Sequence, residues 1–322
     1  MGLMVPERLC RELREVLARA VEMNLGDVIL LSGGLDSSII ALLASRIGDV
    51  KAVSVYLENS PGSDLSYAKM AAGFLGIEHL IRVFNLGELE AAIRSTIRIL
   101  RTFDPMEVRN SAAIYIALRH ARDNDGRIAM TGDGGDELFA GYSFLYNLDL
   151  EELDRKIREI WRRMSFSSTT LGEALGIRVK QPFLDREVLS FAENLDSRFR
   201  IGFRDGKRHG KYILRMAFEE MLPKEIIWRE KVPIEGGSGT SILPRIFEER
   251  ISDQDVDKLR ERYLVEDGVK IRSKEQLFCY QIYRELFGPP HPDGSTKKIC
   301  PMCHSNVPDD ANYCKVCGAY PI

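Results

Sequence analysis

The sequence predicts an α/β protein with a doubly wound parallel sheet, a mainly helical second half and a small cysteine-rich end. Short apolar segments alternate with helical patterns over about the first 145 residues, an alternation typical of parallel sheets covered by helices. The alternation then stops, and four cysteines stand within the last 23 residues. These observations together place a sheet first, helices next and a metal-binding end last.

Composition excludes several classes of protein. The 322 residues are 44% hydrophobic and 29% charged, which is typical of a globular protein and excludes disorder over most of the chain. A net charge of −3 excludes a chain-wide basic field for nucleic acid. The apolar runs are too short to span a bilayer, and the first residues lack the apolar core of a signal peptide. We therefore expect a cytoplasmic protein without a membrane segment.

The elements of the first part begin with a helix over residues 6–24, whose apolar residues recur at helical spacing. A buried strand at Asp27–Leu31 follows, then the loop Ser32–Ser38 and a helix at Ile39–Arg46. Further strands are expected at Val50–Leu57, Glu78–Phe84 and Arg127–Met130, and further helices at Asp64–Leu75, Glu88–Leu100 and Asn110–Arg122.

In the second half, the sequence predicts helices at Leu150–Met164, Arg186–Asn194, Lys211–Met221, Ile242–Arg250 and Lys274–Phe287. Residues 288–298 contain three prolines and two glycines and predict a linker, because neither residue continues a helix. We expect one domain over 1–287, divided into an α/β core at 1–145 and a helical part at 146–287. The linker at 288–298 would then lead to a separate end at 299–322.

The loop Ser-Gly-Gly-Leu-Asp-Ser-Ser at 32–38 is the first chemical signal. Two glycines let the backbone wrap around an anion, and the start of the following helix attracts negative charge. The loop lacks the Gly-Lys-Ser/Thr ending of ordinary P-loop ATPases. Asp36 would repel a phosphate unless a cation intervened, so the loop predicts Mg²⁺. The alternative is a structural glycine turn before a helix.

The second signal is the segment Thr131–Tyr142, in which three acids stand among four glycines directly after a predicted strand. Ligands bind at the carboxyl ends of strands in parallel sheets. Asp36 and Asp136 could therefore meet at one Mg²⁺ although they are far apart in sequence. The alternatives are a solvated acidic loop or a calcium loop, and the segment lacks EF-hand spacing.

Together the two motifs resemble the synthetase domain of glutamine-dependent asparagine synthetases and their β-lactam synthetase relatives, a branch of the PP-loop ATP pyrophosphatases. The second motif is the more specific, since the first is shared across the superfamily. The resemblance covers about Pro6 to Phe287. Other segments that resemble the family are Val53–Leu57 with Ser60–Leu65, Pro182–Asp185, Lys211–Phe218 and Leu222–Lys231.

The resemblance implies an ATP-dependent ligase that forms AMP. A substrate carboxylate would attack the α-phosphorus of ATP, and ammonia would attack the resulting acyl-adenylate. Asp36 and Asp136 would hold Mg²⁺, and the catalytic residues would be Asp133, Asp185 and Lys231. ATP and its pyrophosphate would be bound by Leu31, Ser32, Gly33, Gly34, Asp36, Ser37, Ser38, Val55, Thr131, Gly132 and Lys231.

Two departures from the family concern its substrates. We expect no glutaminase domain, because residue 2 is Gly where that domain needs a Cys nucleophile. Ammonia would then be free or come from a separate glutaminase, or another nucleophile would replace it. The family's Glu-x-Arg before Pro-Phe-Leu-Asp is Arg178-Val-Lys180 here, which indicates a rebuilt acceptor site. Aspartate is therefore only one possible acceptor, and its identity is left open.

A basic segment leaves a second enzyme class open, namely a tRNA-modifying PP-loop ATPase. The segment is either a solvated surface or a contact for a polyanion. Its members are Arg198, Arg200, Arg204, Lys207, Arg208, Lys211 and Arg215.

The cysteine pattern predicts a structural zinc ribbon. Cys300 and Cys303 are separated by ten residues from Cys314 and Cys317, and four thiolates in two such pairs select Zn²⁺. A segment this short cannot bury a core, so the metal would supply its folding energy. Its contact could be the body of the chain, a protein partner or RNA. Without a signal peptide, this pattern favours a reducing compartment over a disulfide framework.

Overall fold

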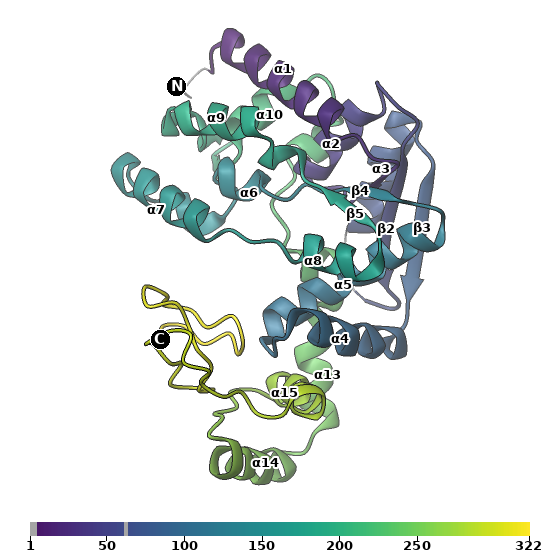
Figure 1. Ribbon diagram of the computed structural model, residues 1–322. Coiled ribbons are helices and arrows are strands. Elements are labelled where there is room, and N and C mark those ends of the chain that lie inside the picture. The colour runs from purple at the N-terminus through teal and green to yellow at the C-terminus, as the bar shows by residue number, and fades with distance from the viewer. Residues whose placement is uncertain (1–4, 61–63) are drawn as a thin grey trace. The chain divides into compact units, whose positions relative to one another are not determined.

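The computed structural model describes residues 5–60 and 64–322 (Figure 1). The expected Ser60–Leu65 loop is described only in part, since residues 61–63 lie outside these ranges. The chain divides into two compact units. Unit 1 contains the residues up to 56 with 63–82 and 117–233, and unit 2 contains 57–62, 83–116 and 234–322.

The sheet is built around β1 (Val28–Leu30), which pairs in parallel with β2 (Lys51–Leu57) on one side and β4 (Ile128–Met130) on the other. β3 (His79–Phe84) and β5 (Arg178–Lys180) complete the order β3-β2-β1-β4-β5. The chain thus runs outward from β1 in one direction and then in the other, which confirms the doubly wound sheet. Such a sheet binds ligands where the direction changes, here between β1 and β4.

Three early helices belong to unit 1: α1 (Glu7–Met23), α2 (Leu35–Ala44) and α3 (Asp64–Leu75). Two helices from the second half, α9 (Arg186–Asn194) and α10 (Tyr212–Phe218), pack on α1, as Figure 1 shows. Their apolar side chains form one buried core with those of β1 and α2. The remaining elements of unit 1 are α6 (Gly135–Leu138), α7 (Leu150–Arg163), α8 (Ser167–Leu175), the hairpin β6–β7 (Gly202–Arg204, Lys207–His209) and α11 (Lys224–Ile227).

Several elements were not expected from the sequence, among them β5, α8, the hairpin β6–β7 and α14 (Asp253–Asp267). β5 has only three residues, two of them charged, so no apolar run marks it. It forms because it is an edge strand, where the side chains need not be buried and only one neighbour, β4, is required. The formation of β5 therefore depends on its pairing with β4 and not on the strand's own residues.

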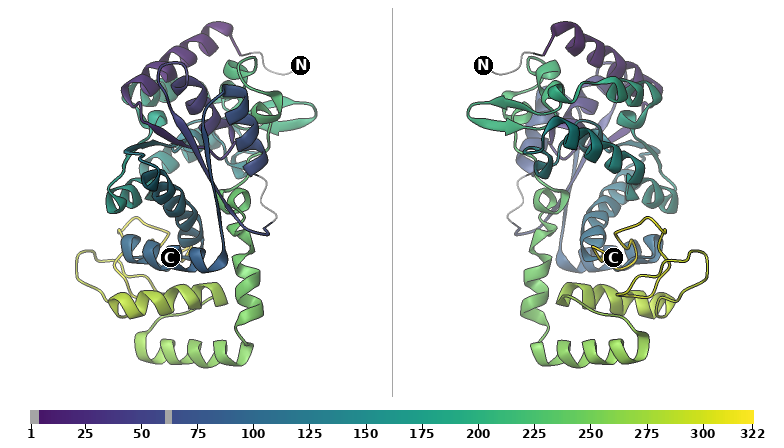
Figure 2. Two further views of the ribbon diagram at one scale, coloured as in Figure 1. Left: turned by 90° about the vertical axis from the view of Figure 1, so that its right-hand side faces the viewer. Right: turned by 90° about the vertical axis from the view of Figure 1, so that its left-hand side faces the viewer.

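Unit 2 is mainly helical and is arranged around α15 (Lys274–Phe287), which contacts α4 (Leu86–Leu100), α13 (Leu243–Arg250) and α14 (Asp253–Asp267). Figure 2 shows α14 and α15 lying side by side. The short α12 (Ile234–Ser238) also belongs to it.

Helix α5 (Pro105–Asp123) begins in unit 2, earlier than the expected start at Asn110. Asp104 Oδ1 accepts a hydrogen bond from the Met106 N–H at 3.1 Å, and Pro105 suits the first helical position. This capping turn extends the helix beyond its apolar pattern. The preceding residue, Phe103, is fully buried with its ring 4.9 Å from that of Tyr280 and 5.1 Å from that of Tyr283.

The C-terminal segment, residues 299–322, contains turns and one antiparallel bridge between Ile299 and Asn306. It groups with the helices of unit 2, although the sequence predicts a linker before it. Whether 288–298 separates two folding units stays a prediction. Among residues 5–60 and 64–322, none of the helices combines the length and the apolar composition that a membrane-spanning segment requires.

Candidate functional site

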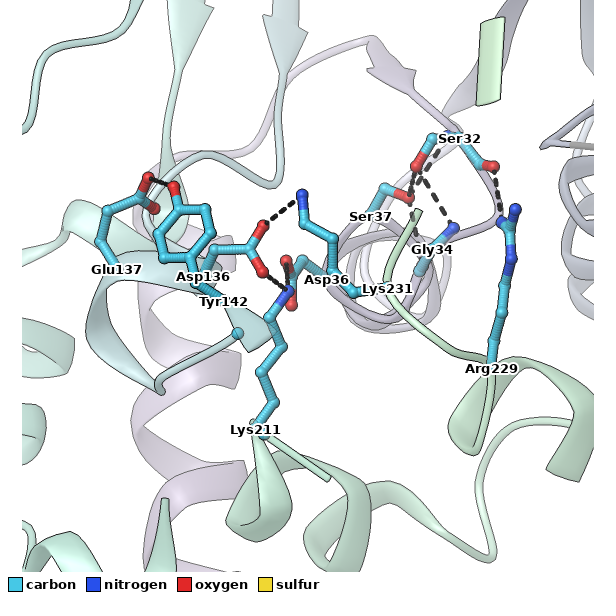
Figure 3. A network of polar contacts seen from close by, with 12 residues as sticks. Ser32, Gly34, Asp36, Ser37, Asp136, Glu137, Tyr142, Lys211, Arg229 and Lys231 are labelled. Atoms are coloured by element: carbon cyan, nitrogen blue, oxygen red, sulfur yellow. Dashed lines mark hydrogen bonds and ion pairs between the residues drawn. The ribbon is translucent and has the colours of Figure 1, made fainter. Parts of the chain in front are cut away.

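The loop Ser32–Ser37 follows β1 and runs into the first turn of α2, which begins at Leu35 and not at the expected Ile39. The loop is closed by its own side chains (Figure 3). Ser32 Oγ lies 3.1 Å from Ser37 Oγ and accepts a hydrogen bond from the Gly34 N–H at 3.2 Å. Gly33 has a φ of 70°, and a Cβ there would lie 2.3 Å from the Ala68 backbone nitrogen of α3. Only glycine lets the loop pass this close to α3, and the amides at the start of α2 remain available to an anion.

Asp36 in this loop and Asp136 in the acidic loop after β4 meet at one lysine. Lys211 Nζ lies 2.5 Å from Asp36 Oδ2 and 2.6 Å from Asp136 Oδ1. Lys231 Nζ lies 3.2 Å from Asp136 Oδ2 on the other side of this carboxylate (Figure 3). We call these four side chains the charged cluster. It lies at the change of direction between β1 and β4, where the sequence places the two aspartates.

Glycines make room for the cluster. A Cβ on Gly135 would lie 2.4 Å from Asp36 Cγ, and one on Gly141 would lie 1.8 Å from Asp136 Oδ1. The acidic loop therefore packs directly against the aspartates because it lacks side chains at these two positions.

Burial and the neighbouring charges shift the pKa of each of three side chains in the cluster in opposite directions. Burial raises the pKa of Asp36, although Lys211 opposes this. Burial would also raise the pKa of Asp136, but Lys211 and Lys231 outweigh it and the pKa is lowered. Burial alone would lower the pKa of Lys211, but Asp136 and Asp36 raise it. The lysine is therefore a fixed positive charge, and Asp136 is the more strongly ionised acid.

The carboxylates of the cluster fit a divalent cation. Asp36 Oδ1 is buried and has no hydrogen-bond partner among residues 5–60 and 64–322. Asp136 Oδ1 is also buried, and its partner is the Lys211 ammonium at 2.6 Å. A buried carboxylate oxygen without a partner is unfavourable, and oxygen is the ligand atom that Mg²⁺ prefers.

Asp133 is held by donors on one of its two oxygens. Thr131 Oγ1 at 2.8 Å, Ser168 Oγ at 2.6 Å and Gln181 Nε2 at 3.0 Å all donate to Asp133 Oδ2. The three donors come from the end of β4, from α8 and from the residue after β5. They fix the orientation of the carboxylate and leave Oδ1 as its other acceptor atom.

Four of the residues expected to bind ATP lie in β2 or directly after β1 and β4. Leu31 follows β1 and its N–H donates to Val53 O at 2.9 Å, while Val55 lies in β2. Thr131 and Gly132 follow β4, and a Cβ on Gly132 would lie 3.0 Å from Asp36 Cβ. The parallel order of β2, β1 and β4 places these residues at one edge of the sheet.

Two residues expected to act at the site, Ser38 and Asp185, have contacts outside the charged cluster. Ser38 is fully buried in α2, and its Oγ has no hydrogen-bond partner in the described parts of the chain. Asp185 caps α9: its Oδ1 accepts the Glu187 N–H at 3.0 Å and its Oδ2 accepts Asn24 Nδ2 at 3.1 Å. Neither of these two contacts involves a residue of the charged cluster. Its catalytic role is a prediction of the resemblance.

Two basic residues of the site were not singled out for it from the sequence. Lys211 lies in the basic segment and in one segment that resembles the family, and Arg229 lies in another such segment. Arg229 Nη2 pairs with Asp64 at 2.5 Å, its Nη1 donates to Ser32 O at 3.4 Å, and its guanidinium lies 4.0 Å from the Tyr67 ring centre. A hollow of about 470 Å³ is lined by Tyr67, Arg229 and five neighbours, but not by the aspartates. We therefore place the candidate site at the charged cluster and not at this hollow.

An aromatic pair lies beside the cluster. Lys231 Nζ lies 5.7 Å from the Tyr142 ring centre, and Phe144 stacks on Tyr142 at 5.5 Å. The Tyr142 hydroxyl donates to Glu137 at 2.6 Å. Burial, followed by the charge of Glu137, raises the pKa of Tyr142, so the phenol stays protonated.

The basic segment is paired or buried to a large extent. Arg198 pairs with Asp196 at 2.6 Å and Lys207 with Glu230 at 2.7 Å, while Arg204 pairs with Glu219. Arg200 and Arg215 are each 3% exposed and donate to backbone carbonyls. This arrangement favours a structural role for the segment over an open surface for a polyanion.

The four C-terminal thiols converge. The ligand atoms of Cys300, Cys303, Cys314 and Cys317 all lie within 4.8 Å of one another, and all four side chains are buried. Cys10 and Cys279 are buried free thiols outside this group. The four converging residues could hold a metal ion.

The sequence matches the family model for asparagine synthase over residues 12–171 and 167–298. It is 31% identical over 281 residues to the glutamine-hydrolysing asparagine synthetase of Gallus gallus, covering 80% of this chain and 48% of that protein. It is 30% identical over 303 residues to asparagine synthetase B of Escherichia coli K12, covering 86% of this chain and 53% of that protein. The chain thus spans about half the length of the curated relatives that it matches.

The similarity to solved structures is weaker. NMN synthetase from Francisella tularensis matches with a TM-score of 0.40 and 16% identity, covering 88% of this chain and 95% of that one. NH3-dependent NAD synthetase from Campylobacter jejuni matches with a TM-score of 0.31 and 17% identity, covering 69% and 98%. At these scores the likeness is no evidence for a shared activity.

Proposed function

The chain belongs to the asparagine synthase family, and from this premise we propose that it is an ATP-dependent, AMP-forming amide ligase. A substrate carboxylate attacks the α-phosphorus of ATP, pyrophosphate leaves, and ammonia attacks the acyl-adenylate to give the amide and AMP. The observation that carries the proposal is the charged cluster, in which two aspartates and two lysines meet beside a glycine-rich loop.

The loop and the lysines of this chain act on the pyrophosphate. The loop Ser32–Ser37 offers hydroxyls and the amides at the start of α2 to the phosphates. Lys231 is 28% exposed and can reach a bound phosphate, whereas Lys211 is buried between the aspartates. Two fixed positive charges stabilise negative charge that develops on a departing pyrophosphate.

Asp36 and Asp136 would hold Mg²⁺ through oxygens such as the unpartnered Asp36 Oδ1. When bound, the ion neutralises phosphate charge and allows a carboxylate to lie within a phosphate loop.

Asp133 would act on the amine. An attacking ammonia must lose a proton as the amide forms, and a fixed carboxylate oxygen can accept it. Ser168 and Gln181 orient Asp133 through Oδ2, so that Oδ1 is the oxygen proposed for this step. The resemblance also marks Asp185 as catalytic. In this proposal its side chain caps α9 and so holds the start of that helix in position.

Substrate and nitrogen source stay open within this proposal. The acceptor is a small carboxylate, aspartate or another, because Arg178 and Lys180 depart from the family. Ammonia would be free or would come from a separate glutaminase. None of the six cysteines, all of which the structure describes, forms a disulfide, and this supports a reducing cytoplasm as the proposed compartment. The proposed cofactors are ATP, Mg²⁺ and a structural Zn²⁺.

Labelled ATP tests the reaction. The protein is incubated with Mg²⁺ and a panel of carboxylates, aspartate included, with and without ammonium, and the nucleotide products are separated. We expect AMP and pyrophosphate with the right acceptor. ADP and orthophosphate as the primary products would refute adenylation.

Matched variants test the site. Asp36→Asn and Asp136→Asn are each expected to lower turnover at least about 100-fold, since each removes a proposed metal ligand. Asp49→Asn changes an exposed aspartate before β2 and should leave turnover unchanged. Unchanged turnover in both site variants would place the reaction elsewhere. Copurified RNA with salt-sensitive binding would instead favour a tRNA-modifying enzyme.

A further inference from the structure

We infer that a Zn²⁺ ion held by Cys300, Cys303, Cys314 and Cys317 is an internal support of unit 2, which fixes the N-terminal ends of α5 and α15. The alternative is that the ion serves only a tail that folds by itself behind a linker. The contacts of the two cysteine turns with the helices of unit 2 decide between them.

The four sulfurs have the spacing of a tetrahedral zinc site. Cys300 Sγ lies 3.7 Å from Cys317 Sγ, and Cys303 Sγ lies 3.7 Å from Cys314 Sγ. Zinc–sulfur distances of about 2.3 Å give sulfur–sulfur distances of about 3.8 Å in a tetrahedron. A disulfide would require about 2.05 Å. With all four positions filled by protein, the site is structural and not catalytic.

The second cysteine turn, residues 314–318, contacts the start of α5. The Phe103 N–H donates to Val316 O at 2.8 Å, and Thr102 Oγ1 donates to Lys315 O at 2.7 Å. Gly318 has a φ of 72°, and a Cβ there would lie 2.4 Å from Asp104 Oδ1. This aspartate caps α5, so the turn packs directly against a helix cap.

The same turn contacts the start of α15. Cys317 O accepts hydrogen bonds from Arg272 Nη2 at 2.6 Å and Gln276 Nε2 at 2.8 Å. Gln276 is 1% exposed and its Oε1 also accepts the Arg272 N–H at 2.7 Å. Cys317 is itself a proposed ligand, so the ion fixes the carbonyl that receives both donors.

The first cysteine turn, residues 300–304, contacts the connection between α14 and α15. The Lys270 N–H donates to Met302 O at 2.8 Å. Gly268 ends α14, and a Cβ there would lie 2.7 Å from the His304 ring. The two turns thus contact two connections of unit 2, α4–α5 and α14–α15, and the first turn of α15. A tail that folds by itself would not require these contacts.

Loss of the ion would remove the support of these contacts. Residues 299–322 contain no helix and only one bridge, so their backbone cannot hold its shape without the sulfur ligands. The buried donors of Thr102, Phe103 and Gln276 would then lose fixed acceptors, which is unfavourable.

Hydrogen–deuterium exchange of the full chain tests the inference, with the zinc-loaded protein compared with the protein after chelation and after zinc is restored. We expect about tenfold faster exchange in peptides over 102–108 and 272–280 without zinc, and recovery with it. Peptides over β1 and α2 in unit 1 should be unchanged. Faster exchange confined to 299–322 would overturn the inference, as would an equal rise throughout both units.

A matched pair of variants tests the contact while the metal stays bound. Tyr313 donates its hydroxyl to Asp104 Oδ2, whereas Tyr320 is 67% exposed. Tyr313→Phe should keep one zinc per chain but speed exchange over 102–108 severalfold, and Tyr320→Phe should change neither quantity. Equal exchange in the two variants would contradict the proposed support of α5.

Discussion

The charged cluster of unit 1 brings together side chains from residues 36 to 231, whereas the thiol cluster of unit 2 (Cys300, Cys303, Cys314 and Cys317) comes from one short segment. The two clusters also differ in whether their polar atoms have partners. In the charged cluster a buried oxygen of Asp36 lacks a hydrogen-bond partner in the described structure, and Lys231 is partly exposed. In the thiol cluster the four sulfurs face one another, and Cys317 O already has two donors. An incompletely satisfied cluster is suited to a transient ligand, and a closed one to a permanent ion.

Cys314→Ser should give the largest effect, because binding of a structural zinc contributes on the order of 10 kcal/mol to folding. We expect loss of zinc and a lower unfolding temperature of unit 2, measured by metal analysis and calorimetry. Cys10→Ser removes an isolated buried thiol of unit 1 and should retain the zinc. Retained zinc in Cys314→Ser would show that the closed cluster is wrongly assigned.

Lys211→Met should destabilise the protein by about 3 kcal/mol or more at neutral pH, because two buried carboxylates lose their shared cation. The loss should shrink with added Mg²⁺, and also at low pH, where the carboxylates take up protons. Urea unfolding at pH 5 and pH 7.5 measures both effects. Lys207→Met, at an exposed lysine of the hairpin, should show neither, and a deficit insensitive to Mg²⁺ would argue against a cation site.

Lys231→Ala should lower the rate of pyrophosphate release by about 100-fold while nucleotide affinity changes less, because its charge matters most as the leaving group develops. Single-turnover release of labelled pyrophosphate and equilibrium binding of Mg²⁺-ATP separate the two quantities. Equal losses in both would make Lys231 a binding residue only.

Glu275→Gln tests a buried charge of unit 2 that is outside both clusters. Burial raises the pKa of Glu275 to about 7, although Arg109 lies 3.3 Å from it and opposes the shift. The folded state therefore binds more protons than the unfolded state between about pH 4.5 and 7, and stability falls as pH rises through this window. We expect on the order of 3 kcal/mol to be lost in the wild type and not in the variant.

Urea unfolding between pH 4.5 and 8 measures this difference. The exposed Glu261 of α14 serves as the control, and Glu261→Gln should follow the wild-type curve. Parallel curves for Glu275→Gln and the wild type would assign the pH dependence to other acids.

Gln181→Leu should give the smallest effect, because it removes one of three donors to Asp133 Oδ2. We expect about a tenfold lower rate of amide formation, with pyrophosphate release less affected, since the proton is lost after adenylation. The ratio of amide to pyrophosphate in a single turnover measures this. Gln254→Leu on the exposed side of α14 should leave the ratio unchanged.

The sequence by itself determined the strand-end position of the two aspartates and the convergence of the four thiols. Asp36 and Asp136 each follow a short apolar strand, and parallel strands end at one edge of a sheet. The cysteine pairs converge because a Cys-x-x-Cys turn presents both sulfurs on one side. In both cases a local pattern and a general rule of geometry were sufficient.

Only the tertiary structure decided which neighbours complete these sites. Lys211 is one of seven basic residues in its segment, and nothing local marks it as the one between the aspartates. Ser168 and Gln181 reach Asp133 from α8 and from the end of β5, two elements without a clear sequence signal. The contacts of the cysteine turns with α5 and α15 are also long-range. Such contacts depend on packing between segments remote in sequence, which no local pattern encodes.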